Sequence, residues 1–336
     1  MTTRSIRLIE VALRAGVSVA TASNALSGNR YVSPDFVERV VRAAEELDYR
    51  GNHSARSLRT GRLNTIGLVV PDVTNPFFAE IVRSIERFAA ETDRSVVLSN
   101  TDFEPAREST ALSSLRSSTD GLLLLSTGPD LPAVRALVEF GLPVVALDEI
   151  VEVAGVGGVY SDNEAGGRLA ARHLVERGAK VPGLIEGPPK LPTAALRRRG
   201  FEAELHRLGA RLDPAHVVQQ PYSLDGGRAG TRALLAGGQV DAIFASTDMQ
   251  AIGAVFESED LGYGVPDEVL VCGFDGISWS GRIRPSLTTL QQDVSGLAGQ
   301  AFDLLVAMME TGSPARDVIL PVQLMPREST ARRVAG

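Results

Sequence analysis

The feature that most constrains the fold is a series of short apolar runs that begins near Thr65 and alternates with helix-length segments. The eight runs cover residues 66–70, 96–98, 122–125, 144–147, 183–185, 217–218, 242–245 and 269–274. Short apolar runs of this kind are typical of buried strands, and strands separated by helices form parallel sheets. Eight such strands fit two doubly wound α/β lobes better than one.

Composition excludes several classes of protein. The 336-residue chain is 44% hydrophobic and has a single cysteine, Cys272, which rules out a disulfide within the chain. Its four histidines lie far apart, so no metal site or cofactor is expected. No apolar run reaches about 18 residues, and the charged start does not resemble an export signal, so we expect a cytoplasmic protein with no membrane contact.

The charge is distributed unevenly along the chain. Residues 1–62 contain ten arginines and six acids, a formal charge of +4, so the −7 of the whole chain leaves −11 on the remainder. Because DNA binding depends on local release of counterions from phosphates, a basic N-terminal segment on an acidic body is compatible with DNA as a partner.

Residues 1–50 have the pattern of an all-α helix-turn-helix domain. A first helix starting near Ile6 is expected to end at Gly16, where the backbone turns sharply, and Ser18 can cap a second helix. A third helix begins with Ser33 as its cap and Pro34 at its first position. Its apolar stripe is Val37, Val40, Val41, Ala44 and Leu47.

In such domains the second helix enters the major groove of DNA. The outward residues of this helix include Val19, Ala20, Ser23 and Asn24. The alternative from the residues alone is a generic helical hairpin with a solvated face.

Residues 51–62 are expected to form a hinge helix and linker. The segment 52–61 is capped, ends in glycine and spans about two turns, which is too short to be stable without support from a second copy or DNA. Leu58 lies between Arg56 and Arg59, an arrangement suited to wedging a base step while the arginines contact phosphates. A flexible linker is the alternative.

Three segments resemble the lactose-repressor (LacI/GalR) family of transcription regulators: EVALRAGVSVATASNALSGNRYVS, NHSARSLRTG and NTIGLVVPDVTNPFFAEI. The resemblance implies that Val19, Ala20 and Asn24 face bases, and that Leu58 intercalates in the minor groove. It further implies DNA contacts by a second group: Ser18, Thr21 and Ser23 at phosphates, with Asn52, Ala55 and Arg56 in the hinge.

Two positions of the headpiece depart from the family pattern. Asn24 stands where arginine is usual, and asparagine suits adenine whereas arginine suits guanine, so the operator half-site is expected to differ by ~1–3 kcal/mol of preference at one base. Arg7 stands where a threonine cap is usual, and Ser5 is a candidate replacement cap.

The resemblance also implies a two-lobed, periplasmic-binding-protein-like (type I) core over residues 63–336 that hinges about a shared cleft. Crossovers are expected near Asp162, Gln292 and Val322. They divide the core into an N-lobe of about 63–162 and 293–321 and a C-lobe of about 163–291 and 322–336.

Ligands of open parallel sheets bind at the carboxyl ends of the strands. Polar residues follow several runs here: Asn75 caps a helix after the first, Asp148 follows the fourth, Thr247 the seventh and Asp275 the eighth. Phe78 lies centrally on the apolar stripe of its helix and is as consistent with core as with a site, whereas Phe77 is freer to stack on a ligand. For any single acid, a helix cap or a solvated turn is the alternative.

Comparison with the family's sugar sensors gives the full expected effector site: Asn75, Phe77, Phe78, Asp148, Arg197, Tyr222, Thr247, Asp275 and Gln292. Aromatic rings with charged hydrogen-bonding groups suit a saccharide. Glu149 and Thr247 stand where arginine and asparagine are common, and both changes remove donors. Arg197, Arg198 and Arg199 could alternatively form a solvated basic face.

The sequence thus predicts a homodimeric repressor that binds a near-palindromic operator and responds to a small polar effector, most simply a sugar. Whether the effector releases or strengthens DNA binding is not fixed by the residues. The alternatives are a periplasmic-type sugar-binding protein and a sugar-processing enzyme. No catalytic residues are expected, because Lys180 and Lys190 lie outside a P-loop pattern and no nucleophile with a base partner is evident.

Overall fold

The computed structural model describes residues 6–27, 31–47, 49, 63–126, 128 and 132–332. The chain forms two compact units, Met1–Leu63 and Asn64–Gly336. We call the first the headpiece and the second the body, and describe each by itself.

The headpiece is a bundle of α1 (Leu8–Ala15), α2 (Val19–Ser27) and α3 (Pro34–Glu46), each of which contacts the other two. Gly16 ends α1 with φ 65°, and a Cβ there would lie 2.7 Å from Arg39 Nη2. The expected stripe of α3 needs one correction, since Val41 is 40% exposed and Ala43 is buried instead. Ser33 stands at the N-cap position, but its side chain makes no capping hydrogen bond.

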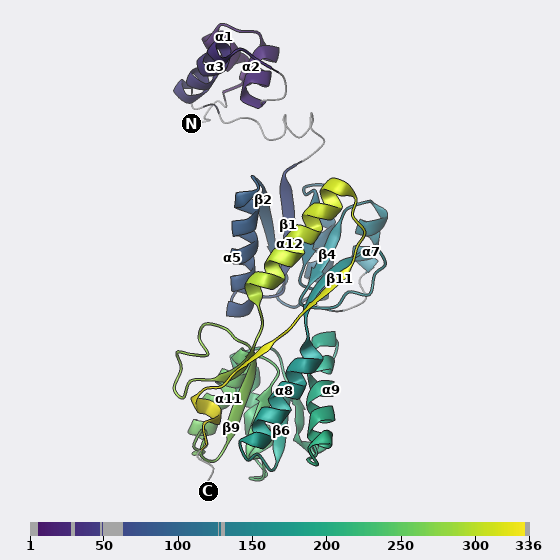
Figure 1. Ribbon diagram of the computed structural model, residues 1–336, viewed down its shortest axis with the longest axis vertical. Coiled ribbons are helices and arrows are strands. Elements are labelled where there is room, and N and C mark those ends of the chain that lie inside the picture. Colours follow the sequence, from purple (N-terminus) through teal and green to yellow (C-terminus); the bar gives the residue numbers. More distant parts are fainter. Residues whose placement is uncertain are drawn as a thin grey trace. The chain divides into compact units, whose positions relative to one another are not determined.

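The N-lobe of the body is built on a six-stranded sheet in which every neighbouring pair of strands is parallel. Helices α5 and α12 cover one face, as Figure 1 shows, and α6 and α7 contact the other. The strand order is β11 (Asp317–Leu320), β5 (Gly157–Ser161), β4 (Val144–Leu147), β3 (Gly121–Leu124), β1 (Thr65–Val70) and β2 (Ser95–Asn100). The helices are α5 (Pro76–Glu91), α6 (Pro105–Leu115), α7 (Pro132–Glu139) and α12 (Val294–Thr311).

The C-lobe repeats this architecture. Helices α8 and α9 pack together on one face of its sheet, and α10 and α11 pack together on the other. The strand order is β12 (Gln323–Met325), β10 (Thr288–Gln291), β9 (Leu270–Asp275), β8 (Ala242–Ala245), β6 (Pro182–Glu186) and β7 (Val217–Gln219), with β12 antiparallel to β10. The helices are α8 (Asn163–Glu176), α9 (Pro192–Arg207), α10 (Leu224–Leu235) and α11 (Asp248–Asp260).

The chain passes between the two sheets three times: from β5 to α8, from β10 to α12, and from β11 to β12 (Figure 1). The eight predicted strands are β1–β4 and β6–β9, so the doubly wound fold is confirmed. The expectation that all eight are buried is wrong for β2, where Val97 and Leu98 are 40% and 43% exposed, because β2 is an edge strand of its sheet. The strands that were not predicted, β5, β10, β11 and β12, are those that flank the crossovers. β5, β10 and β12 are short and contain glycine, threonine or glutamine, which hides them from a search for apolar runs. β11 contains the apolar run Val318, Ile319 and Leu320, which the prediction missed.

Candidate functional site

The start of α2 presents the residues predicted to contact DNA. Ser18 Oγ accepts a hydrogen bond from Thr21 N at 3.0 Å and so caps the helix as predicted. Val19 is 43% exposed. Ser18 and Ala20 are also exposed, and Thr21, Ser23 and Asn24 are partly exposed. Contact of these side chains with DNA remains a prediction.

The start of α1 is stabilised without a serine or threonine cap. Arg7 occupies the N-cap position, and its backbone N donates to Glu10 Oε2 at 2.7 Å. Glu10 therefore fulfils the capping role from inside the helix. The candidate cap Ser5 and the predicted hinge contacts Asn52, Ala55, Arg56 and Leu58 lie outside the described residues.

In the body, the fold brings together four of the nine predicted effector residues: Asp148, Arg197, Asp275 and Gln292. All four are at most 6% exposed. Gln292 Nε2 donates to Asp275 Oδ1 at 3.0 Å, and Arg197 Nη1 lies 4.0 Å from the same oxygen. Burial raises the pKa of Asp148 from 3.8 to about 6, against the opposing effect of Arg197. We call this group the polar cluster.

Arg197 is held in one orientation by neighbours that the sequence analysis did not identify. Its Nε donates to Asn163 Oδ1 at 2.7 Å, its Nη1 donates to the carbonyl of Ser246 at 2.6 Å, and its guanidinium carbon lies 3.8 Å from the centroid of the Phe274 ring. These residues follow or end β5, β8 and β9, which is the strand-end position that the prediction already used. A wider search of strand ends would therefore have found Ser246 and Phe274, whereas Asn163 follows β5, a strand that was not predicted.

The neighbouring arginines point elsewhere. Arg198 pairs with Glu186 and Glu202, and Arg199 pairs with Glu164. Of the run 197–199, only the first side chain joins the polar cluster, so the solvated-face alternative applies to the other two.

The cleft also holds buried polar atoms that have no hydrogen-bond partner among the described residues. They are Asp148 Oδ1, Ser161 Oγ, Ser246 Oγ and Gln292 Oε1. An unsatisfied buried polar atom costs about 1–3 kcal/mol. Several of them around one cleft indicate a site made for a ligand with many hydrogen-bonding groups.

Backbone strain is concentrated in the same region. Among the described residues, six non-glycine residues have positive φ, and four of them border the cleft: Asp102 (53°), Phe103 (56°), Asp148 (70°) and Asp275 (116°). Such conformations cost ~1–3 kcal/mol each and cluster at ligand sites, where the surrounding structure holds them.

Two predicted effector residues act as helix caps. Asn75 Oδ1 accepts from Phe77 N at 3.1 Å at the start of α5, and Thr247 Oγ1 accepts from Gln250 N at 3.3 Å at the start of α11. Asp248, next to Thr247, is fully buried and accepts from Gly276 N and three other donors, so it fixes the loop that follows Asp275.

The structure buries both phenylalanines. Phe77, predicted to be the freer ring, is 2% exposed, and Phe78 is 6% exposed, so the prediction that Phe77 is free to stack on a ligand is wrong. Both rings belong to the hydrophobic core, and Phe78 packs edge-on against Phe103 with 6.1 Å between centroids. Phe78 therefore supports Phe103 from the core side.

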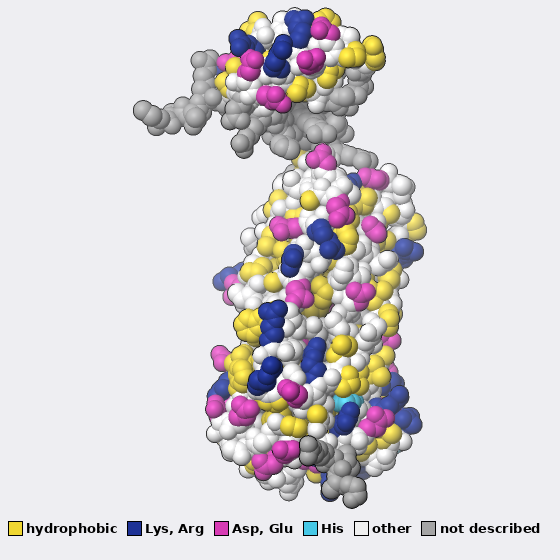
Figure 2. Space-filling view, turned by 60° about the vertical axis from the view of Figure 1, so that its left-hand side comes forward, with side chains coloured by type: hydrophobic (Ala, Val, Ile, Leu, Met, Phe, Trp, Pro, Cys, Tyr) yellow, Lys and Arg dark blue, Asp and Glu magenta, His cyan; other side chains and the backbone are white. Residues whose placement is uncertain are grey.

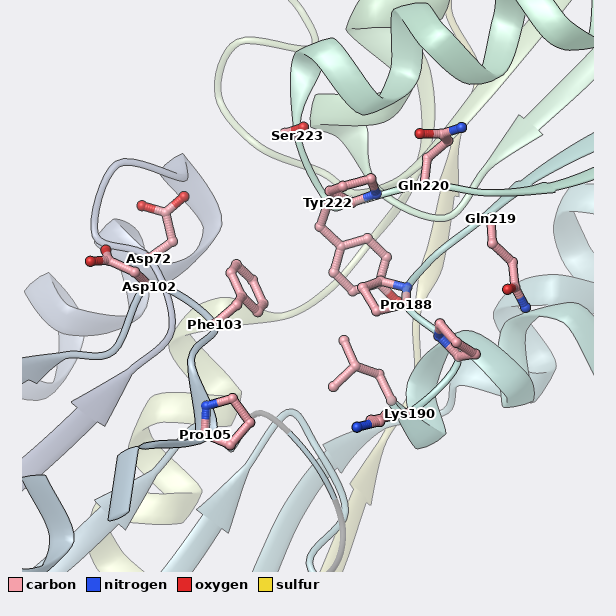
Figure 3. A pocket seen from close by; sticks show the side chains of 13 residues that line it. Asp72, Asp102, Phe103, Pro105, Pro188, Lys190, Gln219, Gln220, Tyr222 and Ser223 are labelled. Atoms are coloured by element: carbon pink, nitrogen blue, oxygen red, sulfur yellow. The ribbon is translucent and has the colours of Figure 1, made fainter. Parts of the chain in front are cut away.

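A pocket of about 680 Å³ opens between the lobes (Figure 3). Phe103 and Tyr222 project into it from opposite sides, with Asp72 and Asp102 on the side of Phe103 and Lys190 near the side of Tyr222. Of the nine predicted effector residues, only Tyr222 lines this pocket. The sequence analysis missed Phe103. This residue follows β2 by three residues, so a search of the segments after each strand would have found it.

Glu149 and Thr193 join the two lobes across the cleft. Glu149 directly follows Asp148 in the N-lobe, and its carboxylate accepts hydrogen bonds from Thr193 N at 3.2 Å and from Thr193 Oγ1. Thr193 is in the first turn of α9, whose N-cap residue Leu191 has no capping side chain. Glu149 thus caps a C-lobe helix from the N-lobe.

The comparisons with known proteins agree with this arrangement. Residues 7–52 match the family described as bacterial regulatory proteins, lacI family, and residues 63–328 match periplasmic binding proteins and sugar binding domain of LacI family. Among the described residues, no helix could span a membrane and no group of side chains could hold a metal ion.

Three similar proteins illustrate the match. A ribose operon repressor of Halalkalibacterium halodurans is 36% identical over 325 residues, which cover 96% of each chain. The lac repressor dimer bound to operator and the anti-inducer ONPF has a TM-score of 0.87 at 26% identity, covering 97% of this chain and 99% of that one. The transcriptional regulator CelR in complex with cellobiose has a TM-score of 0.74 at 30% identity, covering 96% and 99%. The chain belongs to the LacI family of bacterial transcription regulators.

Proposed function

We propose that this regulator represses transcription by binding a near-palindromic operator as a homodimer, and that a small polar effector, a sugar or sugar derivative, changes its affinity for the operator. The observation that supports the effector site best is the polar cluster Asp148, Arg197, Asp275 and Gln292. It is buried between two lobes that are joined at three crossovers. Such connections allow the lobes to move about the site.

The chemistry of the cleft favours a saccharide. Phe103 and Tyr222 offer aromatic faces for the C–H surfaces of a sugar ring. The polar cluster offers charged hydrogen-bonding groups for its hydroxyls, and the charges of Arg197 and Asp148 act on Tyr222. The similar repressor of Halalkalibacterium halodurans is named for ribose, and the CelR structure contains cellobiose. These names support a sugar as the class of effector.

The headpiece supports a regulator over the alternatives. The match over residues 7–52 is to regulatory proteins, and neither an exported binding protein nor a sugar-processing enzyme needs such a domain. In a two-state mechanism, the effector shifts the equilibrium between lobe arrangements and thereby the geometry of paired headpieces on DNA.

DNA binding is tested by selecting binding sites from random double-stranded oligonucleotides with the purified full chain. A two-fold symmetric motif is expected, together with a dimer by light scattering. Leu58→Gly should weaken affinity for the selected operator, measured by fluorescence anisotropy, without changing the melting temperature of the body. A motif without symmetry would contradict the dimer.

Effector binding is tested by a thermal-shift screen of neutral and charged sugars that begins with D-ribose, because a ligand stabilises the folded state by RT ln(1 + [L]/Kd). The ligand that raises the melting temperature should also change operator affinity. Asp275→Ala should abolish both responses and leave operator binding intact. Unchanged ligand affinity in Asp275→Ala would show that the polar cluster does not bind the effector.

A further inference from the structure

The deep part of the cleft has an excess of buried acids. Asp148, Glu149 and Asp275 are 6%, 5% and 3% exposed, and the basic group among the described residues whose charge acts on all three is Arg197, itself 2% exposed. Buried charges require partners, since an uncompensated charge in a protein interior is strongly unfavourable. With all groups ionised, the formal charge of these four side chains is −2.

Arg197 cannot balance all three carboxyls, because its contacts direct it to one side. It donates to Asn163 and to the carbonyl of Ser246, it stacks on Phe274, and it lies 4.0 Å from Asp275. No ion pair within 4.0 Å joins it to Asp148 or Glu149 in the described structure, although its charge acts on both at longer range. The adjacent pair Asp148 and Glu149 is therefore the part of the cleft with unbalanced negative charge.

Several groups face Glu149, and none supplies a close positive charge. Thr193 donates two neutral hydrogen bonds from α9, and Asp148 repels the Glu149 carboxylate. Tyr160 and Tyr222 are also near enough to sense the charge of Glu149. Burial, with Asp148 as the second cause, raises the pKa of Glu149 from 4.5 to about 8. Glu149 thus holds a proton at neutral pH when no other cation is present, whereas Asp148 stays mostly ionised and keeps its negative charge.

An independent observation indicates that the pair faces a ligand. Asp148 Oδ1 is buried and has no hydrogen-bond partner among the described residues, and the nearby Gln292 Oε1 is in the same situation. Both atoms are acceptors. A group that satisfies them must therefore donate, and an ammonium group donates three hydrogen bonds and carries the missing positive charge.

We propose that the effector of this regulator carries a cationic nitrogen, as in an amino sugar or an amino-alditol, and that Asp148 and Glu149 bind that nitrogen together. The hydroxyl-bearing part of the ligand then lies on Arg197, Asp275 and Gln292. This inference rests on the proposed effector function of the cleft and specifies the chemical class of its ligand. The ammonium replaces the proton that Glu149 holds in the free protein, so binding at neutral pH releases a proton to solvent.

Isothermal titration calorimetry and thermal shift at pH 7 test this inference with matched probes on the full chain. The amines are D-glucosamine, D-galactosamine and glucamine, and their neutral partners are glucose, galactose and sorbitol, with N-acetylglucosamine as an uncharged derivative. At least one amine is expected to bind about tenfold or more tightly than its neutral partner. Its binding should release protons, seen as a dependence of the measured heat on the ionisation enthalpy of the buffer.

Variants separate the charge of Glu149 from its structural role. Glu149→Gln keeps the size of the side chain and an acceptor for Thr193, and should reduce the amine preference to near that of the neutral partner. Glu149→Arg should reverse the preference. Glu202→Gln is the matched control, because Glu202 lies on α9 with its side chain 43% exposed and pairs with Arg198. It should leave the preference unchanged.

The outcomes distinguish this inference from the function on which it rests. If a neutral sugar binds as tightly as its amine partner and alters operator affinity, the proposal of a cationic ligand is wrong, while the proposed effector function of the cleft is supported. An equal amine preference in wild type and Glu149→Gln overturns the role of Glu149. Failure of every amine probe to bind overturns the inference, while operator binding by the headpiece is judged by the anisotropy measurements alone.

Discussion

The headpiece and the cleft present their functional side chains in opposite ways. The predicted DNA contacts in the described headpiece come from α2 and its cap residue Ser18, and they are exposed or partly exposed. The polar cluster comes from four separate segments of the body, and each of its members is at most 6% exposed. Exposed groups contribute little to stability, whereas buried charges depend on their partners. Function and stability should therefore be separable in the headpiece and coupled in the cleft.

The largest effect is expected for Arg197→Met in the cleft. Removing the guanidinium leaves Asp275 and Asp148 buried without their positive charge, and breaking a buried pair in this way costs about 3–5 kcal/mol. Urea unfolding of the body should show this loss. Arg199→Met, two residues along the same helix with a side chain that is 64% exposed, should cost less than about 1 kcal/mol. Equal costs for both variants would contradict the buried role of Arg197.

Gly200→Ala tests the packing that places Arg197. A Cβ at Gly200 would lie 2.0 Å from the carbonyl oxygen of Glu164 in α8, so α8 and α9 would have to separate. We expect a loss of about 2–3 kcal/mol and a weaker effector response, measured by urea unfolding and ligand titration. Gly299→Ala in α12, where the nearest atom lies 3.3 Å away on the Phe88 ring, should change stability by less than about 1 kcal/mol. A harmless Gly200→Ala would show that the helix contact tolerates displacement.

The pH dependence of stability tests the charge of the cleft. Burial raises the pKa of Glu149 from 4.5 to about 8, so between these values the folded state holds a proton that the unfolded state has lost. The stability that this proton gives to the folded state is fully present below about pH 4.5. It falls as the pH rises from there and is lost above about pH 8.

Comparison with Glu149→Gln isolates this residue. From pH 6 to 7.5 the wild type should lose about 2 kcal/mol relative to the variant, as judged by urea unfolding without ligand. Parallel pH profiles for the two proteins would show that Glu149 titrates normally in the folded chain.

The smallest effect on stability is expected in the headpiece. Asn24→Arg should move the preferred base at one position of each half-site from adenine towards guanine, by about 1–3 kcal/mol of discrimination. The free energy of unfolding of the chain should change by less than ~0.5 kcal/mol, because Asn24 is only partly buried. Competition anisotropy with operators that differ at single positions measures the preference. An unchanged base preference would show that Asn24 does not face a base.

Local patterns were enough to predict the architecture. The eight apolar runs became β1–β4 and β6–β9, and the glycine and serine around the turn of the headpiece became the end of α1 and the cap of α2. These features depend on residues that are close in sequence, so their chemistry determines the outcome directly. Of the strands beside the crossovers, β5, β10 and β12 escaped prediction because their own residues form no clear apolar run and pairing with neighbouring strands defines them, whereas the apolar run of β11 was overlooked.

Only the tertiary structure decided how the cleft is organised. The sequence identified Asp148, Arg197, Asp275 and Gln292 as candidates together with Asn75 and Thr247, and the structure joins the first four while Asn75 and Thr247 cap helices. Asn163 and Ser246 orient Arg197 from 34 and 49 residues away, and Thr193 donates hydrogen bonds to Glu149, 44 residues away, across the lobes. Which buried acid faces a base, a hydroxyl or another acid depends on such long-range packing, and that packing sets both the charge of the cleft and the ligand it can hold.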